Sequence, residues 1–261
     1  MRALAIAATG MNAQQMRVEV ISNNLANMNT TAYNARRAEF ADLHYQQLAR
    51  AGSIASTTGS VLPTGVQLGL GVRAASVSMD PAQGSISQTG GELDVAISGK
   101  GYLEVTMPSG NAAYTRDGAL KRTGDGLLVT SDGHPVIPDI TIPDDARSIS
   151  INPEGEVYAS FLDRVEPELL GQLTLVAFTN QKGLEALGSN LYAETNASGA
   201  PIEGFAGEDG LGLFRQGYLE DSSVDAVKEI TDLIEAQRGY EMNAKVITAA
   251  DQMLGATAQI R

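Results

Sequence analysis

The strongest pattern in the sequence lies at its C-terminal end, in residues 223–261. Apolar or small residues recur there at alternating steps of four and three, and the stretch contains no proline. A heptad period held this long predicts one long helix that buries a narrow stripe against another helix. Two stripe positions are polar, and we expect both to make hydrogen bonds between subunits: Gln237 and Asp251. The whole stripe consists of Ala226, Ile230, Leu233, Gln237, Tyr240, Ala244, Ile247, Asp251, Leu254 and Ala258.

Residues 2–27 carry the same period, again with polar residues at two stripe positions. Two terminal helices with one shared period predict a helical pair formed by the two ends of the chain. The polar positions favour a pair that also packs against copies of itself, because such residues weaken a contact and often fix its register. The alternative is two amphipathic helices packed on one globular core. The N-terminal stripe consists of Leu4, Ala8, Met11, Gln15, Val18, Ser22 and Leu25.

The first helix is expected to end in a run of short polar residues, 22–31. Asparagine and threonine side chains bond to nearby backbone, and asparagine tolerates the left-handed conformation that ends helices. A capped helix end accounts for most of these residues, including Asn27. Asn23 and Asn24 precede the last apolar residue of the helix, Leu25, so their amides also suit hydrogen bonds across a subunit contact.

The next two segments differ in composition. Residues 33–50 have mixed charge and a helical character carried by Phe40, Leu43 and Leu48. Residues 51–66 are uncharged and rich in Gly, Ser, Thr and Ala, with little periodicity. The sequence therefore predicts a helix-like segment followed by a loop or an extended arm.

From residue 67 to about residue 218 the pattern changes to short alternating or apolar runs that are separated by turn residues. Asp-Gly pairs between such runs predict hairpin turns, because both residues accept positive φ. The predicted fold class is α+β, with long N- and C-terminal helices paired as a coiled-coil module and a central all-β domain of short strands. The expected domains are 1–32 with 222–261, then 33–66, then 67–221. The expected strands are 72–77, 93–97, 102–106, 127–130, 148–151, 157–161 and 172–178, with turns at Asp117-Gly118, Asp125-Gly126, Asp132-Gly133 and Glu154-Gly155.

Composition and charge exclude several classes of partner. The 261 residues carry a formal net charge of -13, and the residues outside 61–220 contribute almost none of it. Nucleic acid is not expected as a partner, because no concentrated basic face is present. The chain has no cysteine, which excludes disulfides and thiolate chemistry. No run approaches about 18 apolar residues, so membrane insertion is not expected.

The first eleven residues resemble a weak signal peptide, but polar residues soon interrupt their apolar run. We interpret them as part of the first helix, so any export is expected to need no cleaved signal. An active site is not expected either. His44 and His134 have no companion at metal-ligand spacing, and no nucleophile or phosphate-binding motif is present. The sequence predicts no catalytic residue, no cofactor and no metal.

The two ends of the chain resemble the bacterial flagellar rod and hook proteins. Residues 20–27, VISNNLAN, and the nearby Asn29-Thr30-Thr31 are similar to the N-terminal signature of that family. Residues 237–245, QRGYEMNAK, and residues 251–254, DQML, are similar to its C-terminal segment. One departure is Gly239, where the family usually has Ala. A glycine inside a helix costs roughly 0.5–1 kcal/mol relative to Ala, so a close approach or a bend is expected there.

Segments between the ends resemble the distal rod members of the family in particular. They are residues 112–118 (AAYTRDG), 171–173 (GQL), 191–195 (LYAET) and 216–220 (QGYLE). The resemblance implies a structural protein rather than an enzyme. Its subunits would assemble helically into a rigid hollow rod that transmits torque from the motor to the hook and passes exported subunits. The terminal helices would form the inner, channel-lining domain, and the β domain would lie outside it. The implied rod-stiffening arm includes Ser53, Thr57, Leu62 and Pro63.

The same resemblance implies the partners and the location. The partners would be copies of the chain, other rod proteins below, the hook protein above, the P and L ring proteins around it, and the flagellar type III export apparatus. The location would be the basal body, from the periplasm to the outer membrane. The assembly residues expected from the stripes and signatures are Leu4, Met11, Gln15, Val18, Asn23, Asn24, Leu25, Asn27, Ile230, Leu233, Gln237, Tyr240, Asn243, Ile247, Asp251 and Leu254.

Two alternatives stay open at this point. Within the family, the chain is a proximal rod or hook-type axial subunit, although the arm and the middle segments favour the distal rod. From a different class, it is a secreted β-domain binding module or hydrolase with helical ends. That reading needs clustered polar side chains in a cleft, which the sequence does not show.

Overall fold

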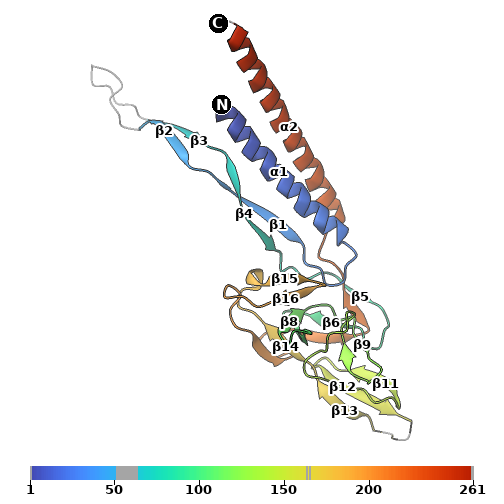
Figure 1. Cartoon of the computed structure of the whole chain (residues 1–261). Coiled ribbons are helices and arrows are strands. Elements are labelled where there is room, and N and C mark those ends of the chain that lie inside the picture. Colours follow the sequence, from blue (N-terminus) through green and yellow to red (C-terminus); the bar gives the residue numbers. More distant parts are fainter. Residues whose placement is uncertain (1, 51–63, 163, 165, 260–261) are drawn as a thin grey trace. The chain divides into compact units, whose positions relative to one another are not determined.

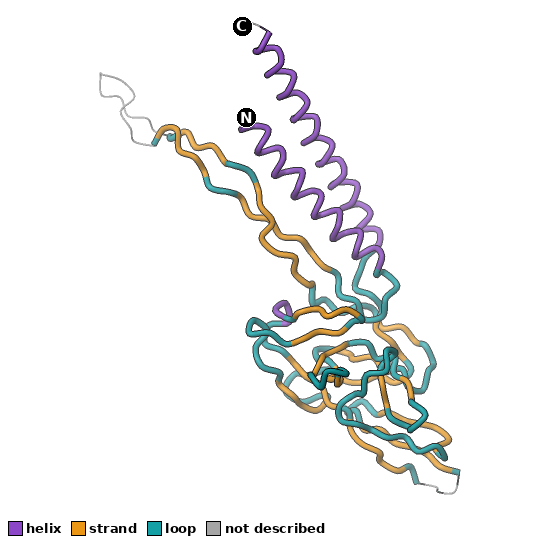
Figure 2. The backbone as a smooth tube through the Cα atoms, viewed as in Figure 1, coloured by secondary structure: helices purple, strands orange, loops and turns teal. Residues whose placement is uncertain are grey.

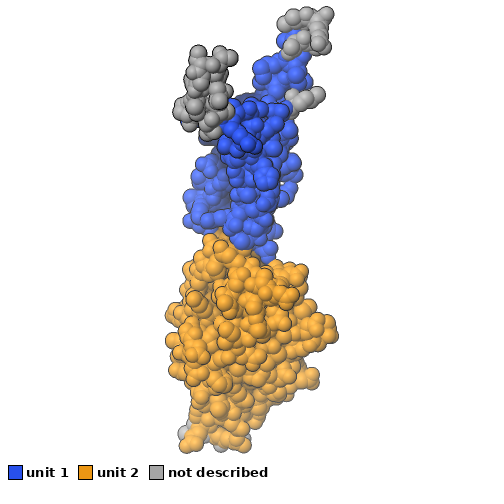
Figure 3. Space-filling view, turned by 90° about the vertical axis from the view of Figure 1, so that its left-hand side faces the viewer, with its two compact units in different colours: residues 1–26, 36–78, 225–261 blue, residues 27–35, 79–224 orange. Residues whose placement is uncertain are grey.

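The computed structural model describes residues 2–50, 64–162, 164 and 166–259, and the chain divides into two compact units. Unit 1 contains residues 1–26, 36–78 and 225–261, and unit 2 contains residues 27–35 and 79–224 (Figure 3). Helices from the two ends of the chain flank a β-rich region, so the α+β fold class is confirmed.

Unit 1 contains both predicted helices. Helix α1 spans Arg2–Ala26 and helix α2 spans Ala226–Gln259, and they lie side by side (Figure 1). The start of α2 is capped by Asp225, whose carboxylate accepts hydrogen bonds from the backbone N–H groups of Val227 and Lys228. Such a cap satisfies N–H groups that have no partner within the helix.

The rest of unit 1 is a ribbon of paired strands, and here the expected helical character of residues 33–50 is wrong. Strand β1 (Arg36–Asp42) pairs with β4 (Val72–Met79), and β2 (Tyr45–Ala49) pairs antiparallel with β3 (Val66–Gly69). The partner strands come from residues 66–79, so the local spacing of apolar residues did not reveal them. Several apolar side chains of β2 and β3 are exposed rather than packed on a helix face.

The regular secondary structure of unit 2 consists almost entirely of short strands, which are joined by loops and turns (Figure 2). Its largest sheet has four strands in the order β15-β16-β8-β7, and a three-stranded sheet has the order β11-β12-β13. The remaining pairs are β9 with β10, β14 with β17, β6 with β18 and β5 with β19. The elements are β5 (Ile86–Gln88), β6 (Val95–Ser98), β7 (Leu103–Thr106), β8 (Ala112–Thr115), β9 (Lys121–Arg122), β10 (Leu128–Val129), β11 (Ala146–Ile151), β12 (Glu156–Phe161), β13 (Glu168–Gln172), β14 (Thr174–Ala177), the 3-10 helix η1 (Gln181–Gly183), β15 (Glu185–Gly188), β16 (Leu191–Ala193), β17 (Ile202–Phe205), β18 (Leu213–Gln216) and β19 (Tyr218–Glu220).

The core of unit 2 lies between these sheets. One cluster is aliphatic apart from Phe214, and Ile97, Leu103 and Leu175 in it are fully buried. A second cluster is aromatic, with the Tyr102 ring edge-on to both Phe178 and Tyr192. Edge-to-face packing of this kind fixes ring positions as well as burying area. Burying these apolar side chains is the main source of stability of unit 2.

The predicted hairpin turns are confirmed at three of four places. Gly126, Gly133 and Gly155 all have positive φ, close to 85°. Gly118 differs, because its φ is not positive and a Cβ there would lie 1.7 Å from the Val95 carbonyl oxygen. Residue 118 is therefore glycine for a close approach of two backbones rather than for a hairpin turn.

Candidate functional site

Helices α1 and α2 contact through glycines that each receive an amide side chain from the opposite helix. A Cβ at Gly10 would lie 3.0 Å from Asn243 Nδ2, and a Cβ at Gly239 would lie 3.1 Å from Gln14 Cδ. The two pairs are reciprocal, and they fix an antiparallel register in which residues 10 and 14 face residues 243 and 239. Small residues at a helix contact let the backbones approach closely.

The same contact stripe continues toward the start of α2 with an ion pair. Arg17 Nη2 lies 2.9 Å from Asp232 Oδ1 and 3.4 Å from Glu235 Oε2. Between this ion pair and the glycines, Ala236 is completely buried, and Gln14 Oε1 is buried without a hydrogen-bond partner in the described part of the chain. A buried acceptor without a donor costs about 1–3 kcal/mol. The helix contact is therefore close but incompletely satisfied.

The observed contact stripe lies one residue away from the predicted stripe on α1. The residues that are buried or face α2 are Ala7, Gly10, Gln14, Arg17 and Ile21, at steps of three and four. The predicted residues Leu4, Met11, Val18 and Leu25 lie beside this line and are half-buried, whereas Gln15 is exposed and donates a hydrogen bond to Glu19. The role of these residues in assembly stays a prediction.

On α2 the predicted stripe is largely open to solvent. Ile230, Gln237, Tyr240, Asp251 and Leu254 are exposed, while Leu233, Asn243 and Ile247 are half-buried. Of this set, Asn243 lies against Gly10 of α1. The exposed members are left for a contact outside the chain, and their role in assembly stays a prediction.

The asparagine signature has a role within the chain. Asn24 is 1% exposed, its Nδ2 donates to the Arg36 carbonyl and its Oδ1 accepts from the Arg36 backbone N–H, at 2.8 and 2.9 Å. Because both ends of this amide are bound to the start of β1, Asn24 cannot supply the expected hydrogen bond across a subunit contact. Asn27 accepts a hydrogen bond from the Thr30 hydroxyl, as a residue of a capped helix end does. Asn23 is exposed.

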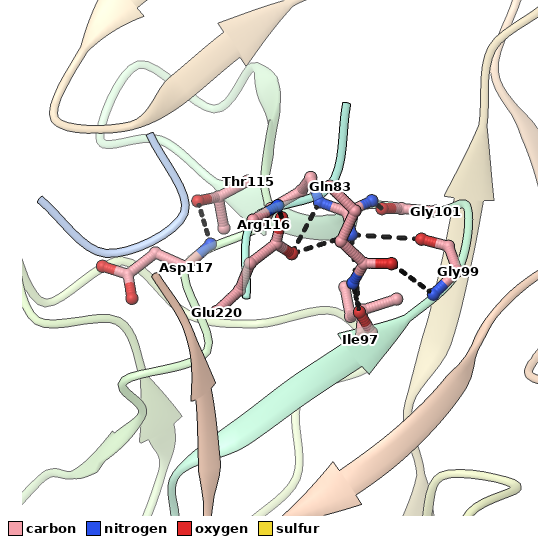
Figure 4. Close-up of polar contacts among 9 residues, drawn as sticks. Gln83, Ile97, Gly99, Gly101, Thr115, Arg116, Asp117 and Glu220 are labelled. Atoms are coloured by element: carbon pink, nitrogen blue, oxygen red, sulfur yellow. Dashed lines mark hydrogen bonds and ion pairs between the residues drawn. The ribbon is translucent and has the colours of Figure 1, made fainter. Parts of the chain in front are cut away.

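Unit 2 contains a buried ion pair that sequence reasoning missed (Figure 4). Arg116 and Glu220 are 7% and 3% exposed, and Glu220 Oε2 lies 2.8 Å from Arg116 Nη2 and 3.0 Å from Arg116 Nε. The guanidinium also donates to the carbonyl oxygens of Gly99 and Gly101. Both charged residues lie inside segments that carried the family resemblance, 112–118 and 216–220, but nothing in the sequence indicated that they meet.

The ion pair belongs to a larger polar network around the turn between β6 and β7. Gln83 donates to the Ile97 carbonyl and accepts from the Gly99 backbone N–H (Figure 4). Glu220 Oε1 accepts from the Gly84 N–H. The Glu220 carbonyl in turn accepts from the Ala32 N–H. The network therefore joins residues 83–84, 97–101 and 116 to Ala32 and Glu220, which are far from them in the sequence.

A second polar cluster surrounds Tyr114. Burial raises the pKa of Tyr114 to about 12, with further contributions from the carboxylates of Glu104, Glu194 and Glu203. Burial and the other two carboxylates also raise the pKa of Glu104. The tyrosine stays protonated at neutral pH, so it cannot act as a base. Among the described residues, no group of three or more His, Cys, Asp or Glu side chains could hold a metal ion.

The arm residues Ser53, Thr57, Leu62 and Pro63 lie outside the described residues. The strands that lead to and from that segment, β2 and β3, expose Tyr45, Leu48, Val66 and Leu68. In the part of the chain that the structure describes, no helix has the length and apolarity needed to cross a membrane.

Comparisons with known proteins place the chain. Residues 4–33 match the model of the flagella basal body rod protein family. Residues 96–159 match the flagellar hook protein FlgE/F/G D1 domain, and residues 215–260 match the flagellar basal body rod FlgEFG protein C-terminal domain. The flagellar basal-body rod protein FlgG of Caulobacter vibrioides is 52% identical over 261 residues, which is 100% of both chains. The chain belongs to the FlgG family.

Other FlgG proteins extend this similarity. The one from Agrobacterium fabrum is 51% identical and the one from Bacillus subtilis is 37% identical, each over 97% of both chains. Among solved structures, the Helicobacter pylori flagellar hook protein FlgE2 is 16% identical, with a TM-score of 0.25 over 71% of this chain and 43% of that chain.

Proposed function

We propose that the chain is a structural subunit of the bacterial flagellar distal rod, which assembles with copies of itself into a rigid hollow shaft. The FlgG family membership supports the rod, and the structure supports the self-assembly. The single observation that carries it is the apolar surface of α2. Val227 is 76% and Met253 65% exposed, and Ile230, Ile234, Tyr240, Met242, Val246 and Leu254 are exposed as well. An apolar helix surface of this extent is typical of a protein–protein contact.

The finer features follow from the same proposal. The terminal helices form a coiled-coil inner domain that lines the channel, and unit 2 forms the outer part. Residues 61–220 carry most of the negative charge and lie mostly in unit 2. An acidic, well-solvated outer surface suits a shaft that turns inside the P and L rings. Other rod proteins and the hook protein bind its two ends. The subunits leave the cell through the flagellar type III export apparatus without a cleaved signal.

A deletion tests the proposed rod-stiffening arm. Removal of residues 50–64 should give a shaft that bends more easily in electron micrographs. A shaft as straight as that of the unaltered chain would remove the arm from the proposal.

The assembly itself is tested by one substitution on α2. Leu254→Asp places a charge in the exposed apolar surface of the helix, close to its C-terminal end. We expect the purified unaltered chain to form tubes that are visible in electron micrographs and the variant to stay monomeric by light scattering. The matched control is Leu162→Asp in unit 2, where the leucine is 80% exposed. A chain that never polymerises, or a Leu254→Asp variant that builds the same tubes, would contradict the proposal.

A further inference from the structure

Unit 1 contains a groove whose chemistry differs from that of the chain as a whole. The groove lies between α1, the start of α2 and β1, and its volume is about 520 Å³. Val20, Ile21, Phe40 and Val72 supply its apolar wall. Four basic side chains but only two carboxylates line it, although the chain carries a net charge of -13. The groove therefore attracts an acidic and partly apolar partner.

Three of the four basic groups are available to such a partner. Arg17 is bound to Asp232 within the chain. In the described part of the chain, no carboxylate lies within ion-pair distance of the side chains of Arg36, Arg37 or Lys228, and Arg37 is exposed. Unpaired cations beside an apolar wall favour an occupant that combines carboxylates with apolar side chains.

Helix α2 presents an exposed face that carries two apolar side chains and one carboxylate, with Arg238 and Lys245 on its border. Ile230, Ile234, Gln237 and Glu241 follow one another at steps of four, three and four, so they lie on one face of the helix, and all four are exposed. This face therefore carries an apolar pair, an amide and a carboxylate in order. In many protein–peptide complexes, one face of an amphipathic helix binds in an apolar groove in the same way. We call these four residues the outer face of α2.

The groove and the outer face lie on different sides of the same helix. Lys228, Glu229 and Asp232 border the groove, and at about 100° per residue the residues of the outer face are turned roughly 80–180° away from these three. One copy therefore cannot place its own outer face in its own groove. A contact between the groove of one copy and the outer face of the next uses two different surfaces, so it repeats without closing unless its rotation happens to form a ring.

We propose that the groove binds the outer face of α2 of a second copy of this chain. This inference rests on the proposed function, because it names the surfaces through which the subunits assemble. The apolar pair fills the wall, and Glu241 pairs with the guanidinium of Arg36 or Arg37.

The first test uses disulfide trapping, which is clean because the chain has no cysteine. Arg37→Cys and Glu241→Cys are made as separate variants, mixed, assembled and oxidised. We expect a disulfide-linked dimer in the mixture and none in either variant alone. The matched control is Arg37→Cys mixed with Met242→Cys, whose methionine is also exposed but lies on another side of α2. Polymers that form without the expected dimer, or that link Arg37→Cys equally well to Met242→Cys, would overturn the assignment of the groove.

The second test reverses the charges. Arg37→Glu and Glu241→Arg should each raise the protein concentration needed for assembly, on the order of tenfold, and the double variant should restore assembly at least in part. Arg164→Glu, an exposed change in unit 2, should leave that concentration unchanged. Single variants that assemble normally, or a double variant no better than the worse single one, overturn the inference while the proposed function stands. If the unaltered chain forms no polymer at all, the proposed function and the inference fail together.

Discussion

Gly239 of α2 faces Gln14 of α1, and a Cβ at position 239 would lie 3.1 Å from Gln14 Cδ. Gly239 therefore accommodates a side chain of the other helix. Its cost in helix propensity is offset by the closer approach of α1 that it permits. The relationship has a direct consequence for the stability of the pair.

Replacement of Gly239 by Val should weaken the helix pair. The added methyl groups need the space that Gln14 fills, and overpacking of this kind costs about 1–3 kcal/mol. The unfolding midpoint in urea, followed by circular dichroism, measures the loss. Gly255→Val is the control, because a Cβ at Gly255 meets nothing within 4 Å in the described structure. Equal midpoints for the two variants would show that the contact at Gly239 is unimportant for stability.

Gln14→Leu should have the opposite effect. The substitution keeps the size of the side chain but removes the buried Oε1 that lacks a donor among the described residues, so we expect a gain of about 1 kcal/mol in the free energy of unfolding. Gln15→Leu changes the neighbouring exposed glutamine, which bonds to Glu19, and should give no gain. A loss of stability in Gln14→Leu would mean that the amide makes a net favourable contribution.

Arg116→Met should destabilise unit 2 strongly. The substitution leaves the Glu220 carboxylate buried without its partner, which typically costs about 3–5 kcal/mol. The double variant Arg116→Met with Glu220→Leu should lose less than the single variant, because no charge is then left buried. Denaturant unfolding of the three chains provides the comparison.

The matched control for that experiment is Arg122→Met. Arg122 lies 3.6 Å from Asp144, whose side chain is 82% exposed, and pairs of this kind contribute about 0–1 kcal/mol. If Arg122→Met and Arg116→Met cost the same, the buried network does not stabilise unit 2 in the way the geometry indicates.

Glu104→Gln should change how the stability of unit 2 depends on pH. Burial, then Glu203 and Glu194, raise the pKa of Glu104 in the folded chain. Its contribution to stability is therefore complete below its unfolded pKa and is lost as the pH rises through its folded pKa. The variant stays neutral, so it should be more stable than the unaltered chain at about pH 7 and closely similar at about pH 4.

Unfolding midpoints at the two pH values test this prediction. Glu185→Gln, an exposed change on β15, should differ from the unaltered chain by the same small amount at both. A Glu104→Gln variant that is less stable than the unaltered chain at neutral pH would contradict the assignment of the shift to burial.

The helices could be predicted from the sequence because their signal is local. A heptad period over residues 2–27 is sufficient to define α1, which spans Arg2–Ala26. The observed contact face of α1 lies one residue away from the predicted face. The reason is that Gly10, Gln14 and Arg17 make the contact rather than large apolar side chains. A hydrophobic pattern cannot identify a stripe of small and polar residues.

The strands near residues 36–49 were missed for a different reason. Their partners come from residues 66–79, and such a pairing leaves no periodic signal in a local window. The same holds for Arg116 and Glu220, which are 104 residues apart in the chain. The sequence identified the two segments, 112–118 and 216–220, but only the folded structure showed that their charges meet.

The division of the chain has a mechanical consequence. The chain passes between the two units after residues 26, 35, 78 and 224, so four backbone connections join them. A domain that is joined by one flexible linker can rotate freely about that single connection. A unit that is joined by four backbone connections cannot complete a full rotation without winding these connections around one another. Twist applied to one unit must therefore reach the other, whatever angle the two adopt.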